Sequence, residues 1–334
     1  MKYDFGIRVD TGKKIGSGHF YRCLSLAEEL CNNGKEVTFI VKNKDEFLSH
    51  IGNKKIPYVT IKSQSIKEEI KSCKNTLDSI KNLIIDLPIQ NEIYGKSFYG
   101  ICKTAIIDDL GNMKVFSDYL FNGSIVKDYH HYKKINKKSH IYVGPKYMIL
   151  RKEFLNKRKE YSISKKEIKN ILLTFGGSDE LGLAKKFINF FSKKKYRITT
   201  VLGPSFKKSD LLINYANKFD NIKVKASVRD MASLFVKQDL VISSSGITSY
   251  ELACLGIPSI LIPIDKHQLP TAISMANNGC AMNYGYWDDN FTRIEKIIDI
   301  LNNYETRKKI HDSGRNRVDG KGCFRVAKNL LNMN

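Results

Sequence analysis

Short runs of β-branched and aliphatic residues alternate with helix-length amphipathic segments along almost the whole chain of 334 residues. This alternation is typical of a parallel sheet whose strands are connected by covering helices. Helices are expected at 19–33 and 65–79, and others should fill the remaining gaps. The expected strands are residues 4–9, 36–41, 58–61, 82–86 and 104–107 in the first half and 170–174, 197–202, 222–225, 240–243 and 259–262 in the second.

The pattern occurs in both halves, and the length fits two α/β domains of ordinary size. The segment 151–169 is rich in lysine and glutamate and poor in strand-forming residues, so it is the expected connection. We place the first domain at 1–155 and the second at 156–334, and the last helix could pack back on the first domain. Two such domains would place the carboxyl ends of both sheets across a cleft, where open α/β sheets bind ligands.

The charge balance is strongly basic, with 56 Lys and Arg against 34 Asp and Glu and a formal net charge of +22. The lysines are spread in short runs, without the arginine and aromatic interleaving of a nucleic-acid platform. This distribution favours a solvated lysine-rich surface and no nucleic-acid partner.

The cysteine and apolar patterns bear on the compartment. Seven cysteines form no C-x-x-C pair and are odd in number, which favours free thiols in a reducing cytoplasm. The longest apolar stretch, 240–264, is interrupted by three serines and Glu251, so no membrane span is expected. The first ten residues lack the apolar core of a secretory leader. No histidine shows a metal-ligand spacing, and neither a metal nor a cofactor is expected.

A glycine loop lies between the first expected strand and helix, with Gly16 and Gly18 directly before His19. A dinucleotide fingerprint would need glycine where Tyr21 stands, and a P-loop spacing fits no better. What remains is one histidine at a helix N-terminus, where the helix dipole favours a neutral imidazole that can act as a general base. The alternative is a histidine that only caps the helix.

Two further strand-to-helix turns occupy residues 175–179 and 243–251. Backbone N–H groups at such turns suit phosphate oxygens, and the second turn offers the small residues Ser244, Ser245, Gly246 and Thr248. Glu251 is placed to accept hydrogen bonds from both hydroxyls of a ribose, or it only complements the helix dipole. Gln268, in the following loop, could reach the same cleft. For 175–179 the alternative is a tight turn in which Ser178 or Asp179 caps the next helix.

These three segments, in this order, resemble the UDP-sugar hydrolase of pseudaminic acid biosynthesis and its spore-coat polysaccharide relatives, which are similar to GT-B glycosyltransferases of the MurG type. The resemblance spans nearly the whole chain. The matching stretches are residues 8–10, 15–27, 107–109, 144–154, 175–179, 243–251, Gln268 and 319–327.

The resemblance implies two Rossmann-like domains of the GT-B type, a UDP-sugar in the cleft between them and no metal. It implies hydrolysis of a UDP-activated amino sugar at the anomeric carbon, in nonulosonic acid or surface polysaccharide biosynthesis. His19 falls on the catalytic base, with Asp10 nearby as a substrate-binding or orienting group. The nucleotide side falls on Gly177, Ser244, Ser245, Gly246, Thr248 and Glu251. One departure is that Leu87-Pro88 stands where the hydrolases carry His-Tyr.

The chemistry of the leaving group is compatible with hydrolysis. UDP leaves far more readily than an alkoxide, so one base and a set of donors for the pyrophosphate could suffice, and water attacking opposite UDP would invert the anomeric centre. The alternative function is a glycosyltransferase that uses the same donor site and an acceptor hydroxyl. A segment such as 115–121 could contribute to an apolar, basic patch for a membrane-linked acceptor, or it could be core. The sugar and the oligomeric state stay open.

Overall fold

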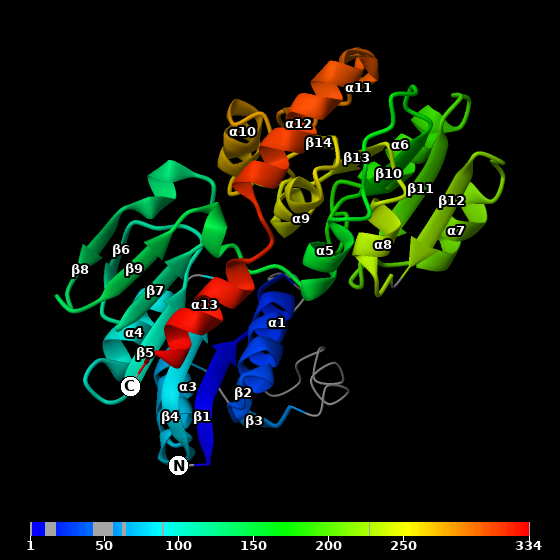
Figure 1. The fold of residues 1–334 in the computed structure, drawn as a ribbon. Coiled ribbons are helices and arrows are strands. Elements are labelled where there is room, and N and C mark those ends of the chain that lie inside the picture. Colours follow the sequence, from blue (N-terminus) through cyan, green and yellow to red (C-terminus); the bar gives the residue numbers. More distant parts are fainter. Residues whose placement is uncertain are drawn as a thin grey trace. The chain divides into compact units, whose positions relative to one another are not determined.

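The computed structural model describes residues 2–10, 18–42, 56–61, 65–88, 90–226 and 228–333. The chain divides into two compact units, which we call unit 1 and unit 2 (Figure 1). Unit 1 comprises Met1–Arg151 together with Lys321–Asn334, and unit 2 comprises Lys152–Gly320. The chain therefore leaves unit 1 four residues before the expected position 155, and its last segment returns to that unit.

Unit 1 is an α/β unit in which helices alternate with short strands. Its helices are α1 (Gly18–Asn32), α3 (Ile66–Lys74), α4 (Asn91–Phe98) and α13 (Gly322–Leu331), with 3-10 turns at Leu77–Ser79, Lys127–His130 and Pro145–Tyr147. Its strands are β1 (Tyr3–Val9), β2 (Val37–Lys42), β3 (Tyr58–Ile61), β4 (Ile80–Asp86), β5 (Lys103–Ile107), β6 (Met113–Val115), β7 (Tyr119–Asn122), β8 (Tyr132–Lys134) and β9 (His140–Val143).

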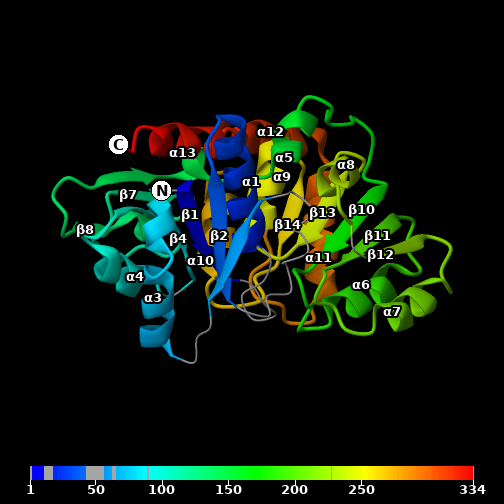
Figure 2. The same cartoon turned by 90° about the horizontal axis from the view of Figure 1, so that it is seen from below.

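The main sheet of unit 1 is parallel and runs in the order β3-β2-β1-β4-β5-β7-β9, while β6 and β8 form a separate parallel pair. One face packs on α1 and α13 in a core that includes Phe5, Phe20 and Leu330. The other face packs on α3 and α4 through a second core that includes Cys73 and Phe98. Figure 2 shows α1 and α13 on one side of β1 and β2. Burial on both faces explains why the central strands read as nearly continuous apolar runs.

Unit 2 repeats this architecture. Its strands are β10 (Asn170–Thr174), β11 (Arg197–Leu202), β12 (Ile222–Ala226), β13 (Leu240–Ser243), β14 (Ser259–Leu261) and β15 (Met282–Asn283). Its helices are α5 (Lys152–Lys157), α6 (Leu183–Phe191), α7 (Ser209–Ala216), α8 (Met231–Phe235), α9 (Ile247–Leu255), α10 (Leu269–Asn277), α11 (Phe291–Asn302) and α12 (Tyr304–Arg317).

The sheet of unit 2 is also parallel, in the order β12-β11-β10-β13-β14-β15. A hydrophobic core joins the sheet to α6, α7 and α11 through side chains such as Phe187 and Ile298. Helix α9 is buried over most of its length and contacts α5 and α12 as well as β13 and β14. Apolar residues on all sides of α9 fit a helix that is enclosed by other elements.

The ten predicted strands are all present, with ends that shift by no more than two residues. The helix expected at 65–79 is shorter, because α3 ends at Lys74 and a 3-10 turn follows. The segment 151–169 is not a bare connection, since it contains α5 and buries Phe154 and Tyr161 in unit 2. The segment 115–121 is core rather than surface patch, with Val115, Leu120 and Phe121 buried.

Two further features concern the residues that the structure describes. None of the helices there is long and apolar enough to span a bilayer. All seven cysteines are free.

Candidate active site

Each of the two main sheets has a switch point where the strand order reverses direction, between β1 and β4 in unit 1 and between β10 and β13 in unit 2. Open α/β sheets bind ligands beside the carboxyl ends of the strands at such points. His19 follows β1 and Asp86 ends β4, while Gly177 follows β10 and Ser244 follows β13. The predicted residues His19, Gly177 and Ser244 therefore lie at the switch points of their units.

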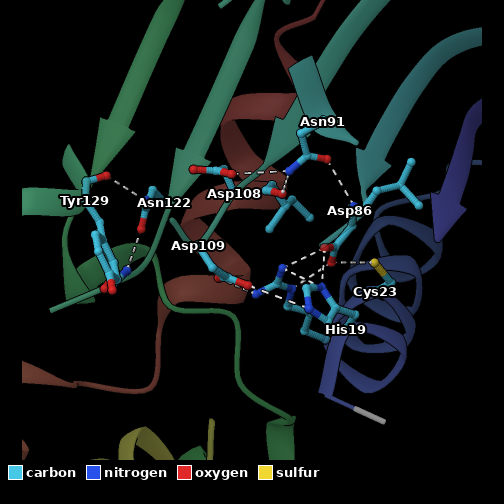
Figure 3. A network of polar contacts seen from close by, with 12 residues as sticks. His19, Cys23, Asp86, Asn91, Asp108, Asp109, Asn122 and Tyr129 are labelled. Carbon is cyan, nitrogen blue, oxygen red and sulfur yellow. Dashed lines mark hydrogen bonds and ion pairs between the residues drawn. The ribbon is translucent and has the colours of Figure 1, made fainter. Parts of the chain in front are cut away.

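His19 is paired with Asp86. The histidine is the second residue of α1, and its Nδ1 lies 2.7 Å from Oδ1 of Asp86 (Figure 3). The Asp86 carboxyl is fully buried, whereas the imidazole keeps 17% of its surface exposed. The arrangement fixes the ring by one nitrogen and leaves the other facing outward from the carboxylate.

Asp86 is surrounded by donors. Its oxygens accept hydrogen bonds from Nε and Nη2 of Arg22, both at 2.6 Å, and from Sγ of Cys23 at 3.1 Å. Burial works to raise the pKa of Asp86, but the charges and hydrogen bonds of Arg22 and His19 outweigh it and hold that pKa well below its usual range. An ionised carboxylate at 2.7 Å accepts a hydrogen, so Nδ1 of His19 donates to Asp86, and in the neutral ring this leaves the lone pair on Nε2. Nη2 of Arg22 also lies 3.0 Å from Nδ1.

Arg22 links this pair to a second carboxylate. Its Nη1 donates to Oδ1 of Asp109 at 2.7 Å, and Oδ2 of Asp109 lies 3.9 Å from Nε2 of His19. Arg22 is buried, whereas the Asp109 side chain is 37% exposed. A half-exposed carboxylate therefore faces the nitrogen that could take a proton.

The segment after β4 is held by Asn91. The backbone N–H of Leu87 donates to Oδ1 of Asn91 at 3.0 Å, and Nδ2 of Asn91 donates to the carbonyl of Ile107 at 3.0 Å. Burial raises the pKa of the neighbouring Asp108, which accepts from the Tyr132 hydroxyl and the Gly111 N–H. The Leu87 side chain is buried in the core beneath α4, so the residue that replaces the histidine of the resembling hydrolases is a packing residue here.

Asp10 has other partners than His19. Its carboxylate pairs with Nη1 of Arg8 at 2.6 Å and with Nζ of Lys42 at 3.0 Å, and both cations also pair with Glu69. Asp10 is 5% exposed. The structure thus gives the orienting position beside His19 to Asp86, which the sequence analysis did not single out, and the predicted role of Asp10 stays a prediction.

Three loops meet at the switch point of unit 2. A Cβ at Gly203, after β11, would lie 2.4 Å from the carbonyl oxygen of Gly176, so the close approach of these two loops requires glycine. A Cβ at Gly176 would lie 3.7 Å from Oγ of Ser244, and the N–H of Ser244 donates to the carbonyl of Thr174 at 3.2 Å. The turns after β10, β11 and β13 are therefore contiguous.

Gln268 connects the loop between β14 and α10 to this edge of the sheet by hydrogen bonds. Its Oε1 accepts from the N–H groups of Ser245 at 3.0 Å and Ile264 at 3.4 Å, while Oγ of Ser245 donates to its carbonyl at 3.1 Å. The predicted residues Ser244, Ser245, Gly246 and Gln268 are thus brought together. Gly246 is the N-cap of α9 and has no side-chain cap, and a Cβ there would meet nothing within 4 Å.

The remaining predicted residues differ in burial, and one of them lies outside the described part of the chain. Thr248 is partly buried in the first turn of α9, and Glu251 is 7% exposed in the same helix. Gly177 is partly buried, and Gly18 is the first residue of α1, whereas Gly16 lies outside the described residues. Among the residues that the structure describes, no group of three or more His, Cys, Asp or Glu could hold a metal ion.

The turn 175–179 also has a structural function. Asp179 adopts a positive φ of 50° and accepts from the N–H groups of Leu183 at 2.8 Å and Ala184 at 2.9 Å. It therefore caps α6, and it is one of the two capping residues that the sequence analysis offers for this turn. Burial raises the pKa of Asp179 to about 6, although the two N–H groups work against that rise.

Comparison with known proteins identifies the fold. Residues 171–319 match the family model of the glycosyltransferase family 28 C-terminal domain. A crystal structure of Acinetobacter baumannii MurG superposes with a TM-score of 0.72 at 13% identity, covering 98% of this chain and 99% of that one. The chain therefore has the two-domain α/β GT-B fold, as the sequence predicts.

Three relatives extend the comparison. An uncharacterized protein of Methanocaldococcus jannaschii is 36% identical over 77% of this chain, which spans about half (54%) of that relative. Spore coat polysaccharide biosynthesis protein SpsG of Bacillus subtilis is 29% identical over 96% of both chains. The UDP-N-acetylglucosamine--N-acetylmuramyl-(pentapeptide) pyrophosphoryl-undecaprenol N-acetylglucosamine transferase of Leuconostoc citreum is 30% identical over 42% of this chain and 41% of its own. The protein is thus a relative of SpsG with a MurG-like fold.

Proposed function

We propose that the protein is a GT-B enzyme that uses a UDP-sugar and passes the glycosyl group to a nucleophile deprotonated by His19. The observation that carries the proposal is the 2.7 Å contact between Asp86 and Nδ1 of His19. In the neutral ring this contact favours the tautomer whose Nε2 can accept a proton, at the switch point of the sheet in unit 1.

The proposal assigns the nucleotide to unit 2. Support comes from the family match over residues 171–319 and from a relative whose printed name is that of a UDP-N-acetylglucosamine-dependent transferase. The contiguous glycine and serine turns provide backbone N–H groups and the start of α9, which together suit a pyrophosphate. Glu251 is assigned to the ribose hydroxyls.

In the proposed reaction, the nucleophile loses a proton to Nε2 of His19 while it attacks the anomeric carbon. The bond between that carbon and the UDP oxygen breaks, and the departing negative charge is stabilised by N–H groups. Attack opposite the leaving group inverts the anomeric centre. No step of this scheme calls for a carboxylic acid to protonate the leaving group, because UDP is already a good one.

The first candidate for the nucleophile is an acceptor hydroxyl, which makes the protein a glycosyltransferase. The family match and the transferase relatives favour this candidate. The second candidate is water, which makes it a UDP-amino-sugar hydrolase. The glycine-loop segment 15–27 and the stretches 144–154 and 319–327, by which the chain resembles the pseudaminic acid hydrolases, favour that reaction.

The test is incubation of the purified protein with a panel of UDP-sugars, with and without carbohydrate acceptors, while UDP and free sugar are both measured. Release of UDP and free sugar together without acceptor supports hydrolysis. Consumption of the donor only after an acceptor is added supports transfer. If no UDP is released from any of these sugars under either condition, the proposed function is wrong.

A further inference from the structure

With the ring of His19 neutral and its Nδ1 donating to Asp86, two hydrogen-bond acceptors face each other beside the β1–β4 switch point. Nε2 of His19 lies 3.9 Å from Oδ2 of Asp109, while the other oxygen of this carboxylate accepts from Arg22 at 2.7 Å. Within the part of the chain that the structure describes, neither Nε2 nor Oδ2 has a hydrogen-bond partner. Nε2 of His19 and Oδ2 of Asp109 can therefore both accept hydrogen bonds from one small molecule that lies between them.

We propose that Asp109 is a specificity-determining residue that, together with His19, selects water as the nucleophile. The inference rests on the proposed function and decides between its two candidates. It concerns a residue to which neither the sequence analysis nor the proposed reaction gives a role.

The spacing suits a molecule with two hydrogens on one atom. An oxygen at a normal hydrogen-bond distance of about 2.8 Å from both acceptors would meet them at nearly a right angle. Water can give one hydrogen to Nε2 of His19 and the other to Oδ2 of Asp109. A carbohydrate hydroxyl has a single hydrogen, so one of the two acceptors would lose its partner, which costs free energy when the bound sugar excludes solvent from the site.

Each of the two acceptor groups is oriented by a hydrogen bond from or to a buried side chain. Asp86 holds the imidazole through Nδ1, and Arg22 holds Asp109 through Nη1. The same Arg22 side chain also donates twice to Asp86, and only 4% of its surface is exposed. A single buried guanidinium therefore sets the spacing between the base and the second acceptor.

The step that follows is balanced. Water gives one proton to Nε2 of His19 as its oxygen forms a bond to the anomeric carbon. The bond from that carbon to the UDP oxygen breaks, and its electron pair leaves with UDP. The second hydrogen, bonded to Asp109 throughout, stays on the oxygen and becomes part of the anomeric hydroxyl of the free sugar.

The experiment is a competition between water and methanol for the glycosyl group. Methanol is small but carries one hydroxyl hydrogen, so the ratio of methyl glycoside to free sugar measures the selection of water. This ratio does not depend on the fraction of folded enzyme or on the overall rate. In Asp109→Ala, which removes one acceptor, we expect the ratio to rise about tenfold, as for the loss of a hydrogen bond to a charged group.

A second variant and a control complete the design. Asp109→Asn keeps the size of the side chain and can still accept from Arg22, but it places a donor where Oδ2 stands, so the ratio should rise here too. Asp78→Ala removes an exposed carboxyl of the same unit and should leave the ratio unchanged.

Three outcomes count against the proposal. An unchanged ratio in both Asp109 variants, with any loss of rate shared by water and methanol, overturns the role of Asp109 and leaves the proposed function standing. Native enzyme that consumes the donor only with a carbohydrate acceptor overturns the selection of water in the same way. Native enzyme that releases no UDP at all contradicts the proposed function, and this inference with it.

Discussion

Asp86 and His19 are 67 residues apart in the chain, and Oδ1 of the carboxylate lies 2.7 Å from Nδ1 of the imidazole. The contact exists because β1 and β4 are neighbours in the sheet and both end at the same edge. The residue that ends β4 therefore orients an imidazole that follows β1 in the sequence.

His19→Asn should separate catalysis from binding. The Asn amide can still donate to Asp86, so the fold should be kept, and UDP affinity should be nearly unchanged because the nucleotide is assigned to unit 2. Turnover should fall roughly 10²- to 10⁴-fold without the base. Turnover of the purified variant, calorimetric UDP binding and circular dichroism check the three parts. Near-normal turnover would make His19 structural and reopen Asp10 as the candidate base.

Asp86→Asn should lower both turnover and stability. The amide no longer balances the buried charge of Arg22, which keeps only Asp109 as an anionic partner. Breaking a buried ion pair on one side typically costs about 3 kcal/mol or more, and chemical denaturation would measure it. We expect at least a roughly tenfold loss of turnover in the protein that remains folded, because the imidazole loses its orienting anion. Asp78→Asn, at an exposed position, is the control, and a native-like midpoint for Asp86→Asn would speak against the buried pair.

The strands and the parallel character of the two main sheets could be predicted from the sequence, but the pairing of His19 could not. Apolar strands such as β10 and β13 can be recognised in the sequence because burial on both faces leaves few polar residues in them. The strands β6 to β9 are absent from the prediction. They are short, and β6, β8 and β9 have partly exposed side chains and no continuous apolar run. Two signals near His19 could have been used. Arg22 is one helical turn further along α1, and Asp86 is an acidic residue at the end of an apolar, buried strand.

Glu251→Gln should weaken UDP binding about tenfold or more if Glu251 holds the ribose. The variant keeps the shape of the side chain but loses charge-assisted hydrogen bonds worth roughly 1.5 to 3 kcal/mol. The residue is 7% exposed, so a small change in packing must be distinguished from a lost ligand contact by measuring the thermal midpoint in parallel. Glu305→Gln, at an exposed position of α12, should bind UDP like the native protein. Unchanged UDP affinity in folded Glu251→Gln would remove this residue from the site.

Asp179 should give the stability of the protein a pH dependence of defined sign. Its pKa is about 6 in the folded protein, against 3.8 for an ordinary aspartate, because burial disfavours the charged form. Between these values the folded state binds a proton that the unfolded chain does not. The stabilisation is therefore fully present below about pH 4 and is lost as the pH rises through about 6.

The variant Asp179→Asn isolates this contribution. Asparagine tolerates the positive φ of 50° at this position and can still accept from one of the two N–H groups at the start of α6, but it does not titrate. The difference in unfolding free energy between native protein and variant should therefore shift in favour of the variant as the pH rises from 4 to 7, by up to about 2 kcal/mol after allowance for solvent screening. Urea denaturation at a series of pH values measures it. A difference that stays constant over this range, or shifts toward the native protein, would mean that the folded state does not raise the pKa of this carboxyl.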